Sequence, residues 1–354
     1  MPHILAVGTA VPPHEVSQDA SMAVSRLLFK NAFSDIDRLL EVFAHSSIRK
    51  RHFCMPLDWF QEEHSFAEKN RHYVEHAVTL GAQAIERCLG KAEITPAEID
   101  CLLFVSSTGF STPSIDARLV NRLGLREDIT RIPLWGLGCA GGAMGLSRAF
   151  EYALAYPEKR VLLVSVELCG LTFMKQDLSK SNLVATCLFA DGAAAVLVGG
   201  DRTEKRGTHP LLHFCAAQTT TWKDSLDVMG WELTDYGLKV IFSRDIPTII
   251  KQQMRENVDR FLHFHQSARD RLSHYVLHPG GTKVLTAYQN SLEISRDDTK
   301  LAAEVLQEYG NMSSPTVLFV LEKSVDQGWA AGEKGLLAAL GPGFSSELVL
   351  LEAR

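Results

Sequence analysis

The chain has 354 residues, of which 46% are hydrophobic and 22% are charged. A chain of this length can bury a large core, as one large domain or as two fused halves. Its net charge of −6, with no basic run longer than Arg49–Arg51, argues against nucleic-acid binding. The longest apolar runs are strand-sized, well short of the ~20 residues that span a bilayer, and the N-terminus does not resemble a signal peptide. We therefore expect a cytoplasmic protein with no transmembrane segment.

The cysteines occur without close spacing, and the chain contains no Cys-x-x-Cys pair. This pattern argues against both a zinc ribbon and a disulfide framework. Most of these thiols are expected to be small buried side chains in a reducing compartment, and no metal site is expected. The seven residues are Cys54, Cys88, Cys101, Cys139, Cys169, Cys187 and Cys215.

Short apolar runs alternate with amphipathic segments, which favours an α/β fold. In the first part of the chain the periodicity predicts helices over 71–90, 114–125 and 143–156. Strands are predicted over 101–107, 131–136, 160–167 and 191–198. The segment 95–98 has the composition of a capped helical turn.

The second part repeats this order more loosely. Helices are predicted over 249–266 and 297–310, and strands over 273–278, 315–322 and 341–351. The polar segment 200–210 between the two parts is the natural junction. The sequence therefore predicts an internally duplicated fold, with halves at 1–205 and 206–354.

Cys139 stands among small residues in 134-LWGLGCAGGAMGL-146, after a predicted strand and before a predicted helix. Unpaired backbone N–H groups and the helix dipole at such a position favour a thiolate. The neighbouring glycines would let a bulky acyl group reach the sulfur. Taken alone, the same pattern also fits a tight turn with Cys139 as filler.

Two polar residues further along could join this cysteine. His278 ends a predicted strand and precedes a Pro-Gly-Gly turn, where functional residues emerge from open α/β sheets. Histidine can share a proton with a thiol near neutral pH. Asn311 lies between a predicted helix and the next predicted strand, where it could cap the helix or donate to an oxyanion.

Together, the motifs 138-GCAGG-142, 278-HPGG-281 and 310-GNMSS-314 closely resemble those of type III polyketide synthases, the relatives of chalcone synthase. Segments 105–109, 188–199 and 341–343 resemble the same family in the same order, so the likeness covers nearly the whole chain. It implies a thiolase-like fold, in which two duplicated α/β halves form a five-layer αβαβα arrangement, and a homodimer.

The resemblance also implies a mechanism. Cys139, held as a thiolate by His278, would take a starter acyl group from CoA. His278 and Asn311 would then donate hydrogen bonds to the thioester oxygen of malonyl-CoA and stabilise the enolate left when carbon dioxide departs. This carbanion would attack the acyl group on Cys139. The CoA thioesters are substrates, and no cofactor is implied.

Cavity residues follow from the resemblance position by position. Phe189 matches a gatekeeper phenylalanine between the CoA tunnel and the cavity, and Val240 stands where the family has a second one. Leu340 replaces a family phenylalanine, and Trp231 lies near a family glycine. Small or polar lining positions are matched by Ser107, Thr172 and Ser313.

Basic residues near the tunnel mouth bind CoA in this family. The run 48-IRKRHF-53 and the turn after His278 fit this role loosely, although an exposed charge run is usually only a solvated face. The candidates are Arg49, Arg51, Lys283, Gly280 and Gly281.

The departures at Val240, Leu340 and Trp231 argue against an aromatic starter. They are more similar to bacterial members that use fatty acyl-CoA starters and make alkylpyrones or alkylresorcinols. Three alternatives stay open: a ketoacyl synthase of the fatty-acid initiation type, a cysteine acyltransferase or hydrolase without condensation, and a non-catalytic binding protein. A thiolase would need a second catalytic cysteine in the C-terminal loop, and 339–354 contains none.

Overall fold

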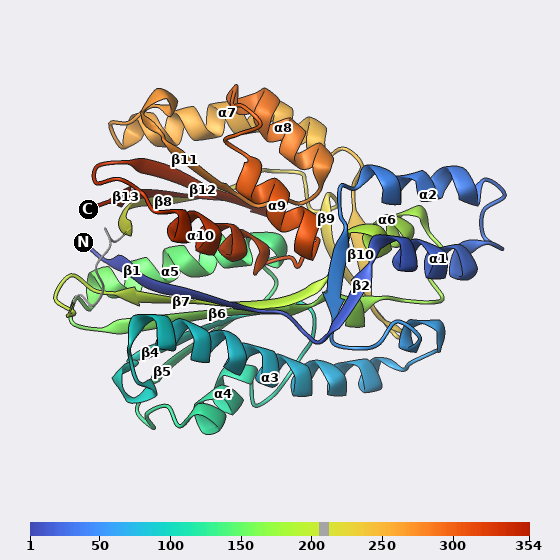
Figure 1. Ribbon diagram of the computed structural model, residues 1–354, viewed down its shortest axis with the longest axis horizontal. Coiled ribbons are helices and arrows are strands. Elements are labelled where there is room, and N and C mark those ends of the chain that lie inside the picture. The colour runs from blue at the N-terminus through green and yellow to red at the C-terminus, as the bar shows by residue number, and fades with distance from the viewer. Residues whose placement is uncertain (205–211) are drawn as a thin grey trace.

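The computed structural model describes residues 1–204 and 212–354 (Figure 1). The predicted boundary between residues 205 and 206 lies outside the described residues. Within the described part no helix is long and apolar enough to cross a membrane.

The two parts of the chain build two sheets of matching topology. In the first part the strand order is β5-β4-β6-β7-β1, and in the second part it is β11-β12-β13-β8. β4 runs parallel to β6, as β11 does to β12, and the following two pairings in each part are antiparallel. A short β1–β8 pairing at His3 and Ile4 joins both parts into one nine-stranded sheet. The strands are β1 (His3–Ala10), β4 (Cys101–Val105), β5 (Thr130–Leu134), β6 (Arg160–Leu168), β7 (Asp191–Gly199), β8 (Leu212–Thr221), β11 (His274–Leu277), β12 (Lys334–Gly341) and β13 (Ser345–Ala353).

Helices complete five layers. α5 (Gly141–Ala155) and α10 (Thr316–Gln327) lie between the sheets and share one apolar core with both of them (Figure 1). α3 (Phe66–Ala92) and α4 (Ile115–Leu123) cover the outer face of the first sheet. α7 (Ile246–Phe264) and α8 (Thr282–Leu292) cover that of the second. The predicted thiolase-like αβαβα fold with duplicated halves is therefore confirmed.

The remaining elements gather mainly at one end of the layers, on the right of Figure 1. There β9 pairs with β10, β2 pairs with β3, and α1 and α2 pack beside α6. Their bounds are β2 (His14–Ser17), β3 (Lys50–Phe53), β9 (Met229–Thr234), β10 (Gly237–Phe242), α1 (Gln18–Phe29), α2 (Ile36–His45), α6 (Lys180–Leu188) and α9 (Lys300–Tyr309).

One predicted element is wrong. The run 315–322 was expected to form a strand, but it begins α10. The segment Thr316–Leu321 is buried on every side between the two sheets, so it carries no polar face that would reveal a helical period. The other predicted helices and strands are confirmed within a few residues at their ends, and the capped turn is present at Pro96–Glu98.

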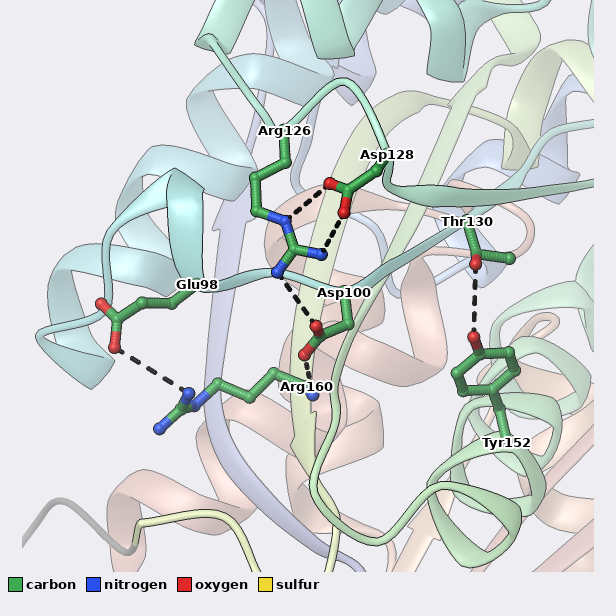
Figure 2. Close-up of polar contacts among 7 residues, drawn as sticks. All are labelled: Glu98, Asp100, Arg126, Asp128, Thr130, Tyr152 and Arg160. Carbon is green, nitrogen blue, oxygen red and sulfur yellow. Dashed lines mark hydrogen bonds and ion pairs between the residues drawn. The ribbon is translucent and has the colours of Figure 1, made fainter.

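A polar network fixes the N-terminal ends of β4, β5 and β6 (Figure 2). The Asp100 carboxylate accepts hydrogen bonds from the Arg126 guanidinium at 3.1 Å and from the Arg160 backbone N–H at 2.9 Å. Arg126 also binds Asp128, at 2.9 and 3.1 Å. Because the three strands are parallel, anchoring this edge aligns their C-terminal ends at the opposite edge, where the candidate site lies.

Candidate active site

Cys139 lies where the sequence predicted it, between a strand and a helix. β5 ends at Leu134, a single 3-10 turn runs from Gly138 to Ala140, and α5 begins at Gly141. The side chain is 5% exposed. The start of α5 directs unpaired N–H groups toward this position, which favours negative charge on the sulfur.

The glycines around Cys139 have a purpose beyond the predicted one. A Cβ at Gly142 would lie 2.1 Å from the Ser314 carbonyl oxygen, and one at Gly138 would lie 2.6 Å from the Pro342 ring. Gly138 also has a φ of +48°, which disfavours other residues. These glycines therefore let the Cys139 turn pack against Pro342 and the Ser314 backbone of the second half. That they also leave space for a thioester stays a prediction.

His278 and Asn311 come from the second half. His278 directly follows β11, and its backbone N–H donates to the Ala338 carbonyl at 2.9 Å. The Asn311 amide nitrogen donates to the Gly280 carbonyl at 3.3 Å, in the turn after His278, and its Oδ1 accepts from the Ser313 N–H at 2.8 Å. Gly310, not Asn311, caps α9. The amide of Asn311 therefore links two of the predicted motifs.

Burial opposes charge on both members of the predicted Cys–His pair. Burial raises the pKa of Cys139 to about 11, although hydrogen bonds from the Ser313 and Asn311 side chains lower it in part. Burial lowers the pKa of His278 to about 3, and neither ring nitrogen has a hydrogen-bond partner among the described residues. This arrangement holds a neutral thiol beside the helix start. The thiolate implied by the resemblance therefore requires that Sγ pass its proton to a base.

Glu167 was not among the predicted site residues. This glutamate is fully buried near the end of β6, where burial raises its pKa to about 7. Its carboxylate accepts from the Ser107 N–H at 2.9 Å, from the Thr108 hydroxyl at 2.8 Å and from the Ser314 hydroxyl at 2.9 Å. A charged residue inside the mainly apolar run 161–168 was the one available signal.

Ser107 connects this network to the turn that carries Cys139. Its hydroxyl accepts a hydrogen bond from the Gly138 N–H at 3.1 Å. Ser313 adopts a φ of +58° beside Asn311. Ser107 and Ser313 were predicted to line the cavity, but of the three predicted polar positions only Thr172 lines the pocket described below.

Phe189 lies between these residues and a pocket. Its backbone forms a β-bridge with Asn311, and its side chain lines a pocket with an empty volume of about 700 Å3, counted out to the solvent. Thr172, Trp231 and Val240 line the same pocket. Apolar side chains from α1, β10 and the neighbouring loops make up much of the wall, among them Val24, Leu28, Leu57, Phe60 and Met174.

Val240 stands where the family has a phenylalanine, and two nearby aromatic rings partly take the place of that missing ring. The Phe189 ring contacts Phe242 edge-on at a centroid distance of 6.2 Å, and it lies 6.4 Å from the Trp231 ring. Leu340 packs in the core beneath α7 and α8. The pocket is therefore shaped by Trp231 and Val240 rather than by Leu340.

The candidate CoA residues occupy different environments. Arg49 is exposed and pairs with Glu308, and Lys283 is exposed in the first turn of α8, directly after Gly280 and Gly281. Arg51 is 1% exposed, and its guanidinium donates to the backbone carbonyls of Thr186 and Phe189, both at 2.7 Å. A residue that binds a CoA phosphate at the tunnel mouth must be exposed, so the buried Arg51 does not fit the predicted CoA contact. Arg51 instead holds the segment that carries Phe189.

Comparisons with known proteins agree with this geometry. Family models described as chalcone and stilbene synthases match residues 1–202 (N-terminal domain) and 212–353 (C-terminal domain). The chain is 46% identical to the "Putative chalcone synthase" of Bacillus subtilis, over 99% of this chain and 98% of the relative. It is 35% identical to the 1,3,6,8-tetrahydroxynaphthalene synthase of Streptomyces peucetius, over 98% and 92%. The crystal structure of the synthase of that name from Streptomyces coelicolor, a bacterial type III polyketide synthase, superposes with a TM-score of 0.93 at 27% identity, covering 99% of both chains.

Proposed function

The chain belongs to the chalcone and stilbene synthase family of type III polyketide synthases, and we propose that it extends long-chain fatty acyl-CoA starters. Condensation of an acyl-CoA with malonyl-CoA is the reaction of this family. The proposal adds the class of starter and the product, an alkylpyrone or alkylresorcinol. The observation that carries it is the pocket behind Phe189.

In the proposed reaction Cys139 carries the acyl chain. The start of α5 would stabilise its thiolate once the proton has left. We infer that His278, whose ring nitrogens have no hydrogen-bond partner among the described residues, accepts this proton. The Asn311 amide and His278 donate to the thioester oxygen of malonyl-CoA as carbon dioxide leaves. The CoA thioesters supply the reacting groups, and no further cofactor is proposed.

The pocket supports an alkyl starter. Its wall is largely apolar, which suits a hydrocarbon chain. Two of the relatives are named as synthases of 1,3,6,8-tetrahydroxynaphthalene and of 3,5-dihydroxyphenylacetyl-CoA. Neither of these products is an alkylpyrone or an alkylresorcinol. The pocket therefore supports the long-chain starter independently of those names.

A panel of acyl-CoA starters from acetyl to stearoyl, each with malonyl-CoA and without carrier protein, tests the proposal. Mass spectrometry should show pyrones or resorcinols, with the highest kcat/KM for long chains. A preference for short or aromatic starters would contradict the proposed starter class. Free fatty acid without release of carbon dioxide would instead indicate a cysteine hydrolase, and a requirement for carrier protein would indicate a ketoacyl synthase.

Replacing Val240 with phenylalanine should shift the preference toward shorter starters. The added ring would lie beside Phe189 and Trp231 and remove volume from the pocket. We expect kcat/KM for the longest starters to fall roughly ten-fold, since overpacking costs about 1–3 kcal/mol, with shorter starters little affected. Leu340→Phe, which changes a side chain outside this pocket, is the control. An unchanged chain-length profile for Val240→Phe would argue against a role of the pocket in starter selection.

We also propose that the protein acts as a cytoplasmic homodimer. An aromatic cluster of Phe66, Phe110 and Trp135 lies on the surface close to the nucleophile turn, and Trp135 is 52% exposed. The Asn70 side chain fixes Phe110 through two hydrogen bonds to its backbone, at 2.8 and 2.9 Å. The adjoining β5 is a half-exposed edge strand. Ordered aromatic side chains beside an unpaired strand edge are typical of an interface.

Trp135→Asp should therefore weaken the dimer. Light scattering across a concentration series should show a rise in the dimer dissociation constant of about ten-fold or more, as expected when an aromatic anchor is lost. Phe264→Asp alters an even more exposed aromatic residue at the end of α7 and should leave the mass unchanged. A Trp135→Asp protein that dimerises like the wild type would exclude this surface.

A further inference from the structure

Lys69 is a buried cation outside the predicted site. It lies in the second turn of α3 and is 6% exposed. Its Nζ donates to the Phe173 backbone carbonyl at 2.7 Å. Because an ammonium has three N–H donors, two remain for other partners.

No ion pair to Lys69 is present among the described residues. The neighbouring carboxylate of Glu68 binds His64 at 2.8 Å instead. Burial lowers the pKa of Lys69 to about 8, with partial opposition from Glu68. A buried charge with so little compensation destabilises a fold, so its presence points to a group that it binds.

Lys69 faces a small pocket that adjoins the acyl pocket. The two pockets share Thr172 and Leu238 as lining residues. Thr108, which also lines the small pocket, donates to Glu167. The ammonium therefore lies between the wall of the acyl pocket and the Glu167 network that supports the nucleophile turn.

We propose that Lys69 is a positioning residue that donates a hydrogen bond to a keto or enolate oxygen of the poly-β-keto chain on Cys139. This inference rests on the proposed function and adds a site for the growing end of the chain. A fatty acyl starter has no such oxygen, whereas each extension adds one. Lys69 should therefore act only after condensation has begun, by holding the chain for further extension and ring closure.

Other anions fit less well. The small pocket is too confined for the nucleotide of CoA, and its other lining groups are aromatic, aliphatic, hydroxyl and amide. An ammonium on the malonyl carboxylate would stabilise the ground state and oppose loss of carbon dioxide. A keto oxygen that gains enolate character carries developing negative charge. It is therefore the acceptor that a single, partly desolvated ammonium binds best.

Lys69→Met tests the proposal, with Lys175→Met as the matched control. Lys175 makes the same kind of contact, from Nζ to the Gln61 carbonyl at 2.8 Å, at a more exposed position. For Lys69→Met we expect loading of the starter on Cys139 to stay within about two-fold of wild type. The ratio of products with three malonyl units to those with two should fall roughly ten-fold, the loss expected for one charge-assisted hydrogen bond. Lys175→Met should keep the wild-type ratio.

An unchanged product ratio in Lys69→Met would overturn the role of Lys69. If the melting temperature falls as well, Lys69 belongs to the structure of the Phe173 loop, because removal of an uncompensated buried charge should instead preserve or raise the melting temperature. If the wild-type protein does not condense acyl-CoA with malonyl-CoA, the proposed function itself is rejected. This measurement comes before any variant is compared, so the two failures can be told apart.

Discussion

Replacing Cys139 with alanine is expected to abolish acyl-enzyme formation and to lower condensation by roughly three orders of magnitude or more, because the covalent intermediate can no longer form. His278 and Asn311 remain in place, so decarboxylation of malonyl-CoA should continue. Intact-protein mass spectrometry with a fatty acyl-CoA measures the loading, and carbon dioxide release measures the decarboxylation. The variant thus separates the two half-reactions.

Cys88→Ala is the matched control for this experiment. Cys88 is also a buried cysteine, but its Sγ contacts the Ala6 carbonyl on β1, and its pKa is raised by burial to about 12. It should load the starter normally. Acyl loading and product formation by Cys139→Ala at rates near those of the control would reject Cys139 as the nucleophile.

Replacing Asn311 with alanine is expected to have the opposite effect on the two half-reactions. The acyl group should still reach Cys139, whereas malonyl-CoA decarboxylation should fall about 10²–10³-fold, the usual effect of removing one donor to a developing oxyanion. The lost donor is the amide that now lies 3.3 Å from the Gly280 carbonyl. Carbon dioxide release with saturating malonyl-CoA is the measurement.

Asn257→Ala controls for the loss of a buried amide. Asn257 is 2% exposed on α7, and its amide donates to the Ser346 hydroxyl at 2.8 Å, remote from the nucleophile turn. It should lose thermal stability but retain decarboxylation. If Asn311→Ala decarboxylates malonyl-CoA within a few-fold of wild type, another group stabilises the enolate.

Long-range packing decided the features that local patterns could not reveal. The apolar run 315–322 has no polar face because sheets cover it on both sides, so its helical state depends on the layers around it. The glycines at 138 and 142 are required by Pro342 and Ser314, about 200 and 170 residues away in the chain. Arg51 belongs to a visible charge run, yet it turns inward to the carbonyls around Phe189.

The sequence by itself determined the α/β class, the duplicated order of elements and the three motif residues, because these depend on local periodicity and on short segments with recognisable spacing. Only the tertiary structure decided how Glu167 is satisfied, that Phe242 stands beside Phe189, and that Lys69 faces a pocket. Each of these depends on segments that lie far apart in the chain and meet only after the two sheets pack around α5 and α10. Hydrogen bonding and burial at such junctions are properties of that packing, and no local pattern encodes them.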